Sequence, residues 1–547
     1  MKAKRLRGIV LPVLGLVGLV SAVAVADVRT FTIDTAGRGA VLPNTSQMLT
    51  AWAVPKVRAP QSVRNGEWDV RDFVEWVEIM AATGGNASRD CYRDPQNRAV
   101  TDDYDFSALV EGCRGIVALG MKPYLKLGNV PMKLSTNIAN GGFMMNVRPP
   151  DDYAEYVRYM EACARALLAA FGKEELLKWR FAVLTEYENA GWFQDASGDA
   201  ERTFQAYCLL YEKTVETFAR VVSPDLTFGA HAMAVTEGLW DERRFFAFVA
   251  VRRLPLKFVT ASFYDMRPGA FTHGLPLPKA IAHLRAGAEK AGLKNLFYGV
   301  DEGRVLEGVS GGKLSRNLAT RIVGDTYQAA YDARVVRQLF DSGADYLAAW
   351  GYLSGPDPWY DGIPSVSFHV ARESAKFKGM RRLSVVAEGG NRPDLETEAV
   401  AAIAENGRRI QIMAYSFTND LHAAGTVRVR CALKCPAAWL GKDLSLTRRI
   451  VDDRVNWFPQ WRRDRKEMGL SDDRFRWSPD DPAVLGGMGL IDAADRVKFQ
   501  ETLLPRYQAR ARLEAQTRTV TPKDGKPFAF EEEMQVNSAI FLELQLR

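Results

Sequence analysis

The chain has few of the residues that metal sites and nucleic-acid surfaces require. Its 547 residues include only five histidines and six cysteines. None of the histidines stands at zinc-site spacing from a Cys or Glu, so we expect no metal and no other cofactor. No basic run resembles a nucleic-acid footprint, which argues against nucleic acid as a partner.

Long apolar runs are also scarce, and the one at the N-terminus is too short to span a bilayer. It covers Ile9–Val20, follows a basic head (Lys2, Lys4, Arg5 and Arg7), and precedes Ala24-Val25-Ala26. This pattern predicts a signal peptide over 1–26 and export to the periplasm or beyond, with no membrane contact after cleavage. Cutting before Asp27 removes four basic residues and no acidic ones, so the net charge falls from +6 to +2. An uncleaved N-terminal anchor is the alternative.

Export would permit disulfides, but the cysteine spacing does not demand them. Cys431 and Cys435 are four residues apart in a strand-like run, which separates them by roughly 13 Å. They could bond only if the strand bent sharply. The pairing of Cys91, Cys113, Cys163 and Cys208 stays open.

Between residues 48 and 381 the chain alternates between short β-branched or aromatic runs and longer amphipathic stretches. The predicted strands are Met48–Val54, Asn86–Tyr92, Lys122–Gly128, Arg180–Glu186, Thr227–Met233, Lys257–Tyr264, Asn295–Glu302 and Tyr346–Tyr352. The predicted helices are Val70–Ala82, Phe106–Leu119, Asp151–Phe171, Ala200–Val221, Asp241–Val251, Pro278–Ala291, Leu318–Ser342 and Ser365–Lys376. Eight such repeats predict an α/β fold, a (β/α)8 TIM barrel. A doubly wound sheet is the alternative, although its Gly-rich turn after the first strand is missing.

From residue 382 to 547 the pattern changes to short alternating runs. Arg409–Tyr415, Thr426–Leu433 and Ile540–Leu546 are examples, and they predict an antiparallel β-sandwich as a second domain. The polar segment Asp452–Asp481 is predicted to be a long loop. Within 27–47, the strand-like run Val28–Ile33 precedes the barrel, and pairing with the C-terminal sheet is one position open to it.

Two predicted barrel strands end at a glutamate. The fourth ends at Glu186 and the seventh at Glu302. Barrel chemistry takes place at the C-terminal ends of the strands, and these two strands lie across the barrel mouth from each other. Two carboxylates meeting there are what glycoside cleavage needs. The alternative is that each glutamate only begins a solvated loop.

Aromatic residues near the same strand ends are typical of a carbohydrate ligand. Trp192, Tyr264 and Trp350 offer flat apolar faces with polar edges, which suit pyranose rings. Ordinary packing at the barrel rim is the alternative for each of them. His231, near the end of the fifth strand, is either a structural histidine or a substrate contact.

Several segments resemble one family in order and spacing. Trp179-Arg180-Phe181-Ala182-Val183 leads to Glu186 as the motif before that family's acid/base does. The other matching segments are Tyr104–Ser107, Leu119–Tyr124, Pro149–Tyr153, Phe171–Glu175, Val222–Leu226 and Arg449–Asn456 followed by Trp461. Together they resemble glycoside hydrolase family 39, which includes β-xylosidases and α-L-iduronidases. With gaps, the resemblance runs over most of the mature chain.

The resemblance implies a retaining double displacement on a carbohydrate substrate. Glu186 would be the general acid/base and Glu302 the nucleophile, in environments that keep the first protonated and the second ionised. Arg89 resembles a family arginine that helps to keep the nucleophile ionised. The expected substrate-binding set is Arg89, Asp90, Asn129, Thr185, Trp192, His231, Tyr264 and Trp350.

The chain departs from the family pattern around this pair. Thr185 and Tyr187 stand where the family has Asn and Pro, and the family's Asn contacts the sugar 2-hydroxyl. Lys126 replaces an acid on the third strand, and Asp90 replaces a common His. Glu188 is a rival for the acid/base role.

Three hypotheses therefore remain at this stage. The first is a retaining glycosidase, with a β-xyloside as the default substrate and a uronide as the other. The second is a non-catalytic carbohydrate-binding relative that kept the barrel, and the third is a purely structural exported protein. The sequence predicts no oligomeric state.

Overall fold

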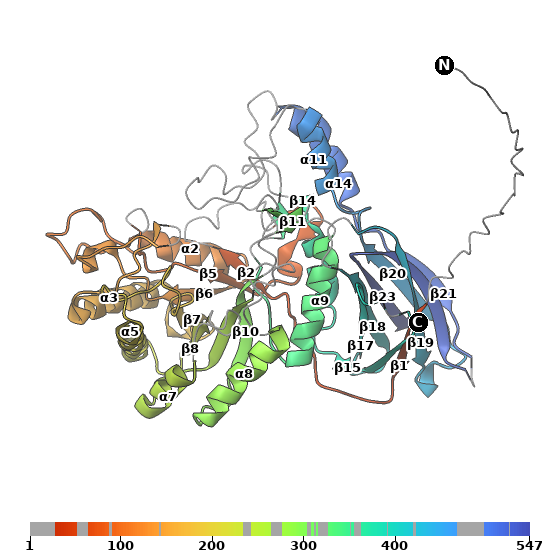
Figure 1. Ribbon diagram of the computed structural model, residues 1–547, viewed down its shortest axis with the longest axis horizontal. Coiled ribbons are helices and arrows are strands. Elements are labelled where there is room, and N and C mark those ends of the chain that lie inside the picture. Colours follow the sequence, from red (N-terminus) through yellow and green to blue (C-terminus); the bar gives the residue numbers. More distant parts are fainter. Residues whose placement is uncertain are drawn as a thin grey trace, which may run out of the picture.

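A parallel barrel and an antiparallel β-sandwich make up the structure, and helix α9 (Tyr327–Ser342) lies between them (Figure 1). The structure is a computed structural model. It describes residues 28–51, 64–86, 90–141, 144–232, 242–263, 276–303, 308–310, 313–315, 327–349, 352–354, 363–390, 392–418, 423–467, 497–523 and 526–547.

Seven parallel strands form the barrel sheet, in the spatial order β10-β9-β8-β7-β6-β5-β2. They are β2 (Met48–Ala51), β5 (Trp76–Ile79), β6 (Lys122–Leu127), β7 (Arg180–Val183), β8 (Thr227–Ala232), β9 (Phe258–Phe263) and β10 (Phe297–Gly303). Residues 345–349 fill the eighth position, because Leu347 bridges Val300 on one side and Ala349 bridges Leu49 on the other. The sheet therefore closes, and the predicted barrel fold is confirmed.

Helices cover the outside of the barrel. They are α2 (Ser107–Ala118), α3 (Tyr153–Phe171), α4 (Lys173–Leu176), α5 (Ala200–Val221), α7 (Glu242–Arg252), α8 (Leu277–Lys290), α9 and α10 (Val366–Ala375). Carboxylates cap the two longest: Asp152 accepts a hydrogen bond from the Ala154 amide at 2.7 Å, and Asp199 accepts one from the Arg202 amide at 2.8 Å. Such caps satisfy amides that the first helical turn leaves without a partner. The predicted barrel helices from Phe106–Leu119 onward are confirmed within the described residues, and α4 is a short additional helix that was not predicted.

The predictions for the first helix and the second strand are wrong. The second barrel strand is β5, which lies inside the range predicted to be a helix, Val70–Ala82. Of that range only 70–72 is helical, as one 3-10 turn, and the described residues of 86–92 form a loop instead of a strand. The prediction failed at Glu78. Its charge interrupts the apolar run of the strand Trp76–Ile79, although the side chain is fully buried and pairs with Lys126.

The barrel interior is apolar at one level and charged at the next. The apolar level consists of Met48, Trp76, Tyr124, Ala182, Phe258, Tyr346 and Ala348. Two residues further along β2, β5 and β6, the inward positions carry Thr50, Glu78 and Lys126, all buried. Since inward positions recur at every second residue, the charged level lies nearer the C-terminal ends of the strands.

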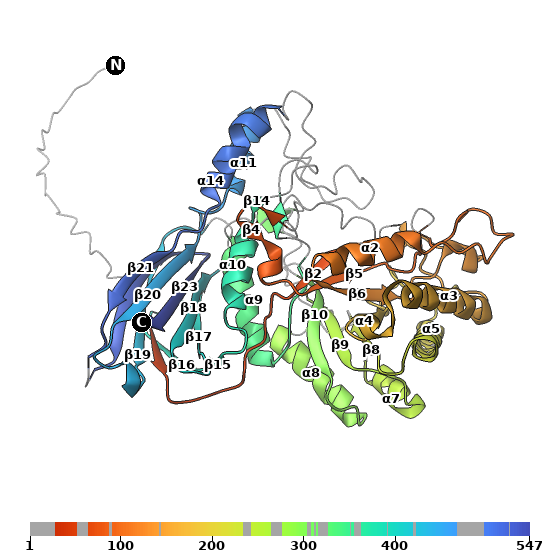
Figure 2. The same ribbon diagram turned by 180° about the vertical axis from the view of Figure 1, so that it is seen from behind.

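Two sheets form the sandwich (Figure 2). The four-stranded sheet has the order β16 (Ser384–Glu388), β1 (Arg29–Asp34), β19 (Thr426–Lys434) and β22 (Phe528–Gln535). The six-stranded sheet has the order β15 (Arg381–Arg382), β17 (Glu396–Ile403), β18 (Arg409–Phe417), β23 (Ser538–Leu546), β20 (Leu444–Val451) and β21 (Gln516–Val520). Strand β1 runs antiparallel to β16 and parallel to β19, so the start of the described chain is built into the C-terminal domain.

The six-stranded sheet joins the two units because both of its faces are covered. On one face, Ile412 and Leu542 pack with Phe31 of the four-stranded sheet. On the other face, Met413 and Phe541 belong to the same hydrophobic cluster as α9, α10 and the barrel. Near-continuous burial along β18 follows from this position between two layers.

Smaller elements complete the described structure. They are β3 (Arg64–Asn65), β4 (Trp68–Asp69), β11 (Gly308–Ser310), β12 (Lys313–Ser315), β13 (Leu353–Ser354), β14 (Ile363–Pro364), α11 (Phe458–Glu467), a π-helical turn (Phe499–Leu503), α14 (Leu504–Arg510) and 3-10 turns at 132–134 and 437–439. Helix α11 corrects the prediction of a continuous loop over 452–481. It is held by Asp464, whose carboxylate accepts hydrogen bonds from Gln460 and from Tyr507 of α14.

Two properties bear on the predicted export. All six cysteines fall within the described residues and carry free thiols. Within the described ranges, no helix combines the length and apolar character needed to cross a bilayer. The predicted signal segment 1–26 lies outside the described residues.

His369 on α10 is expected to make stability depend on pH. Its ring is fully buried, and Nε2 lies 2.7 Å from the carbonyl oxygen of Ala511. Burial and the charge of Arg372 lower the pKa of His369 to about 3. The unfolded chain binds a proton near pH 6.5 and the folded chain does not. Stability from this group is therefore complete above pH 6.5 and is lost as the pH falls toward 3.

Between pH 7 and pH 5 this one group should cost about 2 kcal/mol of unfolding free energy. Urea unfolding of the wild type and of His369→Gln at both pH values measures the effect. His231 is also buried, and it contributes to the pH dependence of stability in both proteins. The difference between the two proteins in the slope of unfolding free energy against pH therefore isolates the contribution of His369. Equal slopes would contradict the prediction.

Candidate active site

Glu186 sits on a tight turn at the end of β7. The strand ends at Val183, three residues earlier than predicted, and the backbone then adopts left-handed conformations at Leu184 (φ +61°) and Glu186 (φ +45°). Such conformations are unfavourable for residues with a side chain and are concentrated at functional sites. The Glu186 side chain is buried by this turn, at 4% exposure.

Three donors hold the Glu186 carboxylate. Ser262 of β9 donates to Oε1 at 2.5 Å. On the other oxygen, Oε2, the indole N–H of Trp192 donates at 2.8 Å and the side-chain amide of Asn189 at 3.1 Å. The orientation of Glu186 is therefore set by its own loop on one side and by the barrel on the other.

A β-bulge positions Glu302. In β10, Val300 pairs with Ala261 and Glu302 pairs with the next residue of β9, Ser262, so Asp301 is an extra residue. Neighbouring strand residues normally point to opposite faces, and the bulge removes this constraint. Asp301 and Glu302 both turn inward. One carboxylate oxygen of Glu302, one of Glu186 and one ring nitrogen of His231 all lie within 4.8 Å of one another.

A buried charge cluster lies beneath the two glutamates. The Lys126 ammonium is 2.9 Å from Glu78 and 3.3 Å from Asp301, and all three side chains are fully buried. Asp301 also accepts hydrogen bonds of 2.6 Å from each of three hydroxyls, those of Tyr124, Thr260 and Tyr346. The cluster anchors the residue that precedes Glu302.

Burial and the neighbouring charges shift the pKa values of the cluster in opposite directions. Burial opposes the charge on Lys126, but Glu78 and Asp301 outweigh it and raise the pKa of the ammonium. Burial also opposes ionisation of Asp301, yet Lys126, His231 and the hydroxyl donors lower its pKa. At Glu78 burial prevails over Lys126, and the pKa rises well above its ordinary value.

His231 connects this cluster to Glu186. Its Nδ1 is in hydrogen-bond contact with Lys126 Nζ, and its Nε2 lies 2.9 Å from Ser262 Oγ. Burial and Lys126 lower the pKa of His231 well below its ordinary value, so the ring is neutral. Both ring nitrogens are engaged, and the adjacent ammonium repels cations. The grouping of Glu186, His231 and Glu302 therefore presents no free imidazole nitrogen to a metal ion.

The other predicted site residues occupy different positions. Asp90 is on the loop after β5, where its carboxylate accepts hydrogen bonds from the amides of Gly85 (2.6 Å) and Met132 (2.9 Å). Burial raises the pKa of Asp90 to about 6. The hydroxyl of Thr185 and the amide oxygen of Asn129 are buried without a hydrogen-bond partner among the described residues. The remaining three, Arg89, Tyr264 and Trp350, lie outside the described residues.

Sequence reasoning missed the supporting residues Glu78, Lys126, Asp301 and Ser262 as parts of the site. A signal for them exists. Lys126 interrupts the apolar strand Tyr124-Leu125-Lys126-Leu127, and Glu78 interrupts Trp76-Val77-Glu78-Ile79. A charge at an inward position of a barrel strand must find a partner inside the barrel.

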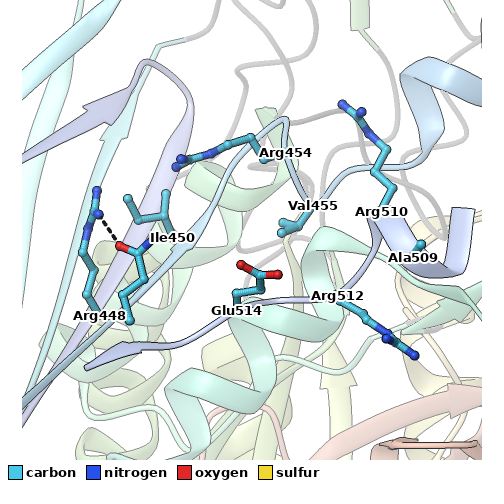
Figure 3. A pocket seen from close by; sticks show the side chains of 9 residues that line it. Arg448, Ile450, Arg454, Val455, Ala509, Arg510, Arg512 and Glu514 are labelled. Carbon is cyan, nitrogen blue, oxygen red and sulfur yellow. Dashed lines mark hydrogen bonds between the residues drawn. The ribbon is translucent and has the colours of Figure 1, made fainter. Parts of the chain in front are cut away.

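A separate hollow of about 270 Å³ lies on the C-terminal domain (Figure 3). Four arginines line it, but Arg454 is bound to Asp452, and Arg510 donates to the carbonyls of Asn456 and Asp453. Figure 3 shows Arg510 and Arg512 extending away from Glu514, the single carboxylate among the described residues that line it. With one carboxylate this hollow lacks the pair that glycoside cleavage requires.

A closed (β/α)8 barrel with two carboxylates meeting at the ends of its fourth and seventh strands defines an architecture typical of glycoside hydrolases. The family model of glycosyl hydrolases family 39 matches residues 90–387. The chain belongs to this family.

Relatives and solved structures agree with this assignment. A β-xylosidase of Geobacillus stearothermophilus is 23% identical over 274 residues, which are 49% of this chain and 51% of the relative. The match thus spans about half the length of that curated relative. A monomeric β-xylosidase structure from Caulobacter crescentus CB15 superimposes with a TM-score of 0.62 at 17% identity, covering 95% of this chain and 99% of that one. The structure of a GH39 enzyme from Xanthomonas axonopodis pv. citri superimposes with a TM-score of 0.62 at 17% identity, covering 97% of this chain and 100% of that one.

Proposed function

We propose that the protein is a retaining glycosidase in which Glu186 is the general acid/base and Glu302 the nucleophile. The observation that carries this proposal is the approach of the two buried carboxylates, since one oxygen of each lies within 4.8 Å of one oxygen of the other. Retaining enzymes place the pair about 5–5.5 Å apart, whereas inverting enzymes leave about 6.5–9.5 Å for a water molecule. The short separation favours direct attack by one carboxylate.

A β-xyloside is the proposed substrate class, and export through the N-terminal segment is the proposed route to it. The substrate rests on the β-xylosidases among the relatives, and the export on the pattern of residues 1–26. Thr185, whose hydroxyl is buried without a partner among the described residues, is available to a sugar hydroxyl. It is shorter than the asparagine of the family pattern, so the sugar contact at this position differs.

A panel of aryl glycosides tests the proposal, with xylosides, glucosides, arabinosides and uronides of both anomers. We expect cleavage of at least one β-glycoside, most rapidly the xyloside, with the first product of the same anomeric form as the substrate, as followed by NMR. Inversion would overturn the roles assigned to the two glutamates. Sugar binding without cleavage across the whole panel would instead support a non-catalytic carbohydrate-binding protein.

A further inference from the structure

Glu186 stands at the end of a continuous line of buried hydrogen bonds. The line runs from Lys126 Nζ to His231 Nδ1, from His231 Nε2 to Ser262 Oγ (2.9 Å), and from Ser262 Oγ to Glu186 Oε1 (2.5 Å). Its first three members come from β6, β8 and β9, and each is at most 1% exposed. They touch Glu186 only through the serine.

The line has one possible direction. An ammonium can only donate, so His231 Nδ1 must accept from Lys126. The neutral ring then carries its proton on Nε2 and donates it to Ser262 Oγ. The serine hydroxyl has one proton, and it donates this proton to Glu186 Oε1. Each step follows from the donor-only character of Lys126, which Glu78 and Asp301 keep charged.

We propose that Lys126, His231 and Ser262 are positioning residues that hold the Ser262 hydroxyl as a donor to Oε1 of Glu186, and so stabilise the carboxylate that Glu186 becomes when it gives up the catalytic proton. The proposal rests on the proposed function of Glu186. Oε2 accepts its hydrogen bonds from Trp192 and Asn189 of the same loop, so Ser262 is the donor that reaches the carboxylate from the barrel side.

In the first chemical step the O–H bond of the protonated Glu186 carboxyl breaks and the proton passes to the glycosidic oxygen. The bond from that oxygen to the anomeric carbon breaks, its electron pair leaves with the aglycone, and Glu302 forms the new bond to carbon. The Ser262 hydrogen bond to Oε1 persists and stabilises the carboxylate that Glu186 becomes. In the second step a water oxygen attacks the anomeric carbon, the bond from that carbon to Glu302 breaks and restores the Glu302 carboxylate, and the Glu186 carboxylate takes the proton that the water gives up.

Several charged or polar groups face Glu186 in this arrangement. Glu302 approaches from β10 and His231 from β8, while Trp192 and Asn189 bind Oε2 from the same loop as Glu186. Lys126, Glu78 and Asp301 lie behind His231. Within the line, Ser262 and His231 can be changed without removing a member of the buried charge cluster, whereas Lys126 cannot, so Ser262 and His231 are the positions to test.

Ser262→Ala is the first test, with two aryl glycosides of the sugar found in the panel. A 2,4-dinitrophenyl leaving group needs no acid, whereas a 4-methoxyphenyl leaving group does. We expect kcat/KM to fall about tenfold to a hundredfold for the methoxyphenyl glycoside and less than about threefold for the dinitrophenyl glycoside. The alkaline limb of the methoxyphenyl pH profile should move to higher pH, because a donor to the carboxylate is lost.

His231→Gln supplies the rescue, since its amide oxygen can accept from Lys126 and its N–H can donate to Ser262. The kcat/KM of His231→Gln should stay within about threefold of the wild-type value for both substrates. His231→Leu removes the hydrogen bond from His231 to Ser262. It should lower kcat/KM for the methoxyphenyl glycoside much more than for the dinitrophenyl glycoside, as expected for Ser262→Ala, and it serves as the test if the serine variant does not fold. Ser416→Ala is the control, because Ser416 is a buried serine of β18 in the C-terminal domain. It should leave kcat/KM unchanged for both substrates. If Ser262→Ala lowers kcat/KM equally for both glycosides and leaves the alkaline limb of the pH profile where it is in the wild type, the positioning role is overturned. A wild type that cleaves no glycoside would overturn the proposed function itself.

Discussion

Replacing Glu302 by glutamine is expected to reduce kcat/KM for aryl glycosides at least about a thousandfold. An amide of the same shape cannot attack the anomeric carbon, so the loss falls on the chemical step and not on the fold. The side chain is 3% exposed, and one of its oxygens lies within 4.8 Å of an oxygen of Glu186. The measurement is steady-state kinetics with the best substrate of the panel.

Glu188→Gln is the matched control for this variant. Glu188 follows Glu186 by two residues and is half-buried, but it is outside the group of atoms that meet within 4.8 Å. We expect its activity to stay within about threefold of the wild type. A 2-deoxy-2-fluoro glycoside should label Glu302 covalently, which mass spectrometry of the peptide would show. A label on another residue, or full activity in Glu302→Gln, would contradict the assignment.

Lys126→Met is expected to lower the free energy of unfolding by about 3–5 kcal/mol. The substitution keeps much of the side-chain volume and removes the charge that lies 3.3 Å from Asp301. The Asp301 carboxylate then stays in the barrel core without its cation, held only by hydroxyl donors. Removing one partner of a buried ion pair costs more than the pair contributes, because the remaining charge is still out of water. Urea unfolding measures the loss.

Two further variants sharpen this result. Lys178→Met removes an exposed lysine that pairs with Glu175, and it should leave the unfolding midpoint unchanged. The double variant Lys126→Met with Asp301→Asn removes both charges, so its loss should be smaller than the sum of the two single losses. Additive losses would show that the two charges are not coupled in the folded protein.

Much of the fold follows from local patterns. The alternation of short strands with amphipathic helices predicted the barrel, and helices such as α5 (Ala200–Val221) appear at the predicted residues. Two apolar runs that end at glutamates pointed to Glu186 and Glu302 before any geometry was known. These features are readable because burial on one face imposes a period on the sequence.

The pattern fails where a charge is buried. Glu78 lies inside β5, and a prediction that treats charge as exposure assigns this strand to a helix. The partner that makes the burial possible, Lys126, is 48 residues away in the sequence. Local pattern cannot reveal such a pair, because each charge alone argues against burial.

The sequence alone therefore determined the barrel and the second domain, and it predicted Glu186 and Glu302 as the catalytic pair. Only the tertiary structure decided how those glutamates are aimed: the bulge at Asp301, the left-handed turn at Glu186, and the line from Lys126 through His231 and Ser262. The reason is physical. Periodicity records which face of a strand is buried, whereas the direction of a carboxylate depends on donors that separate strands bring together only when the barrel closes.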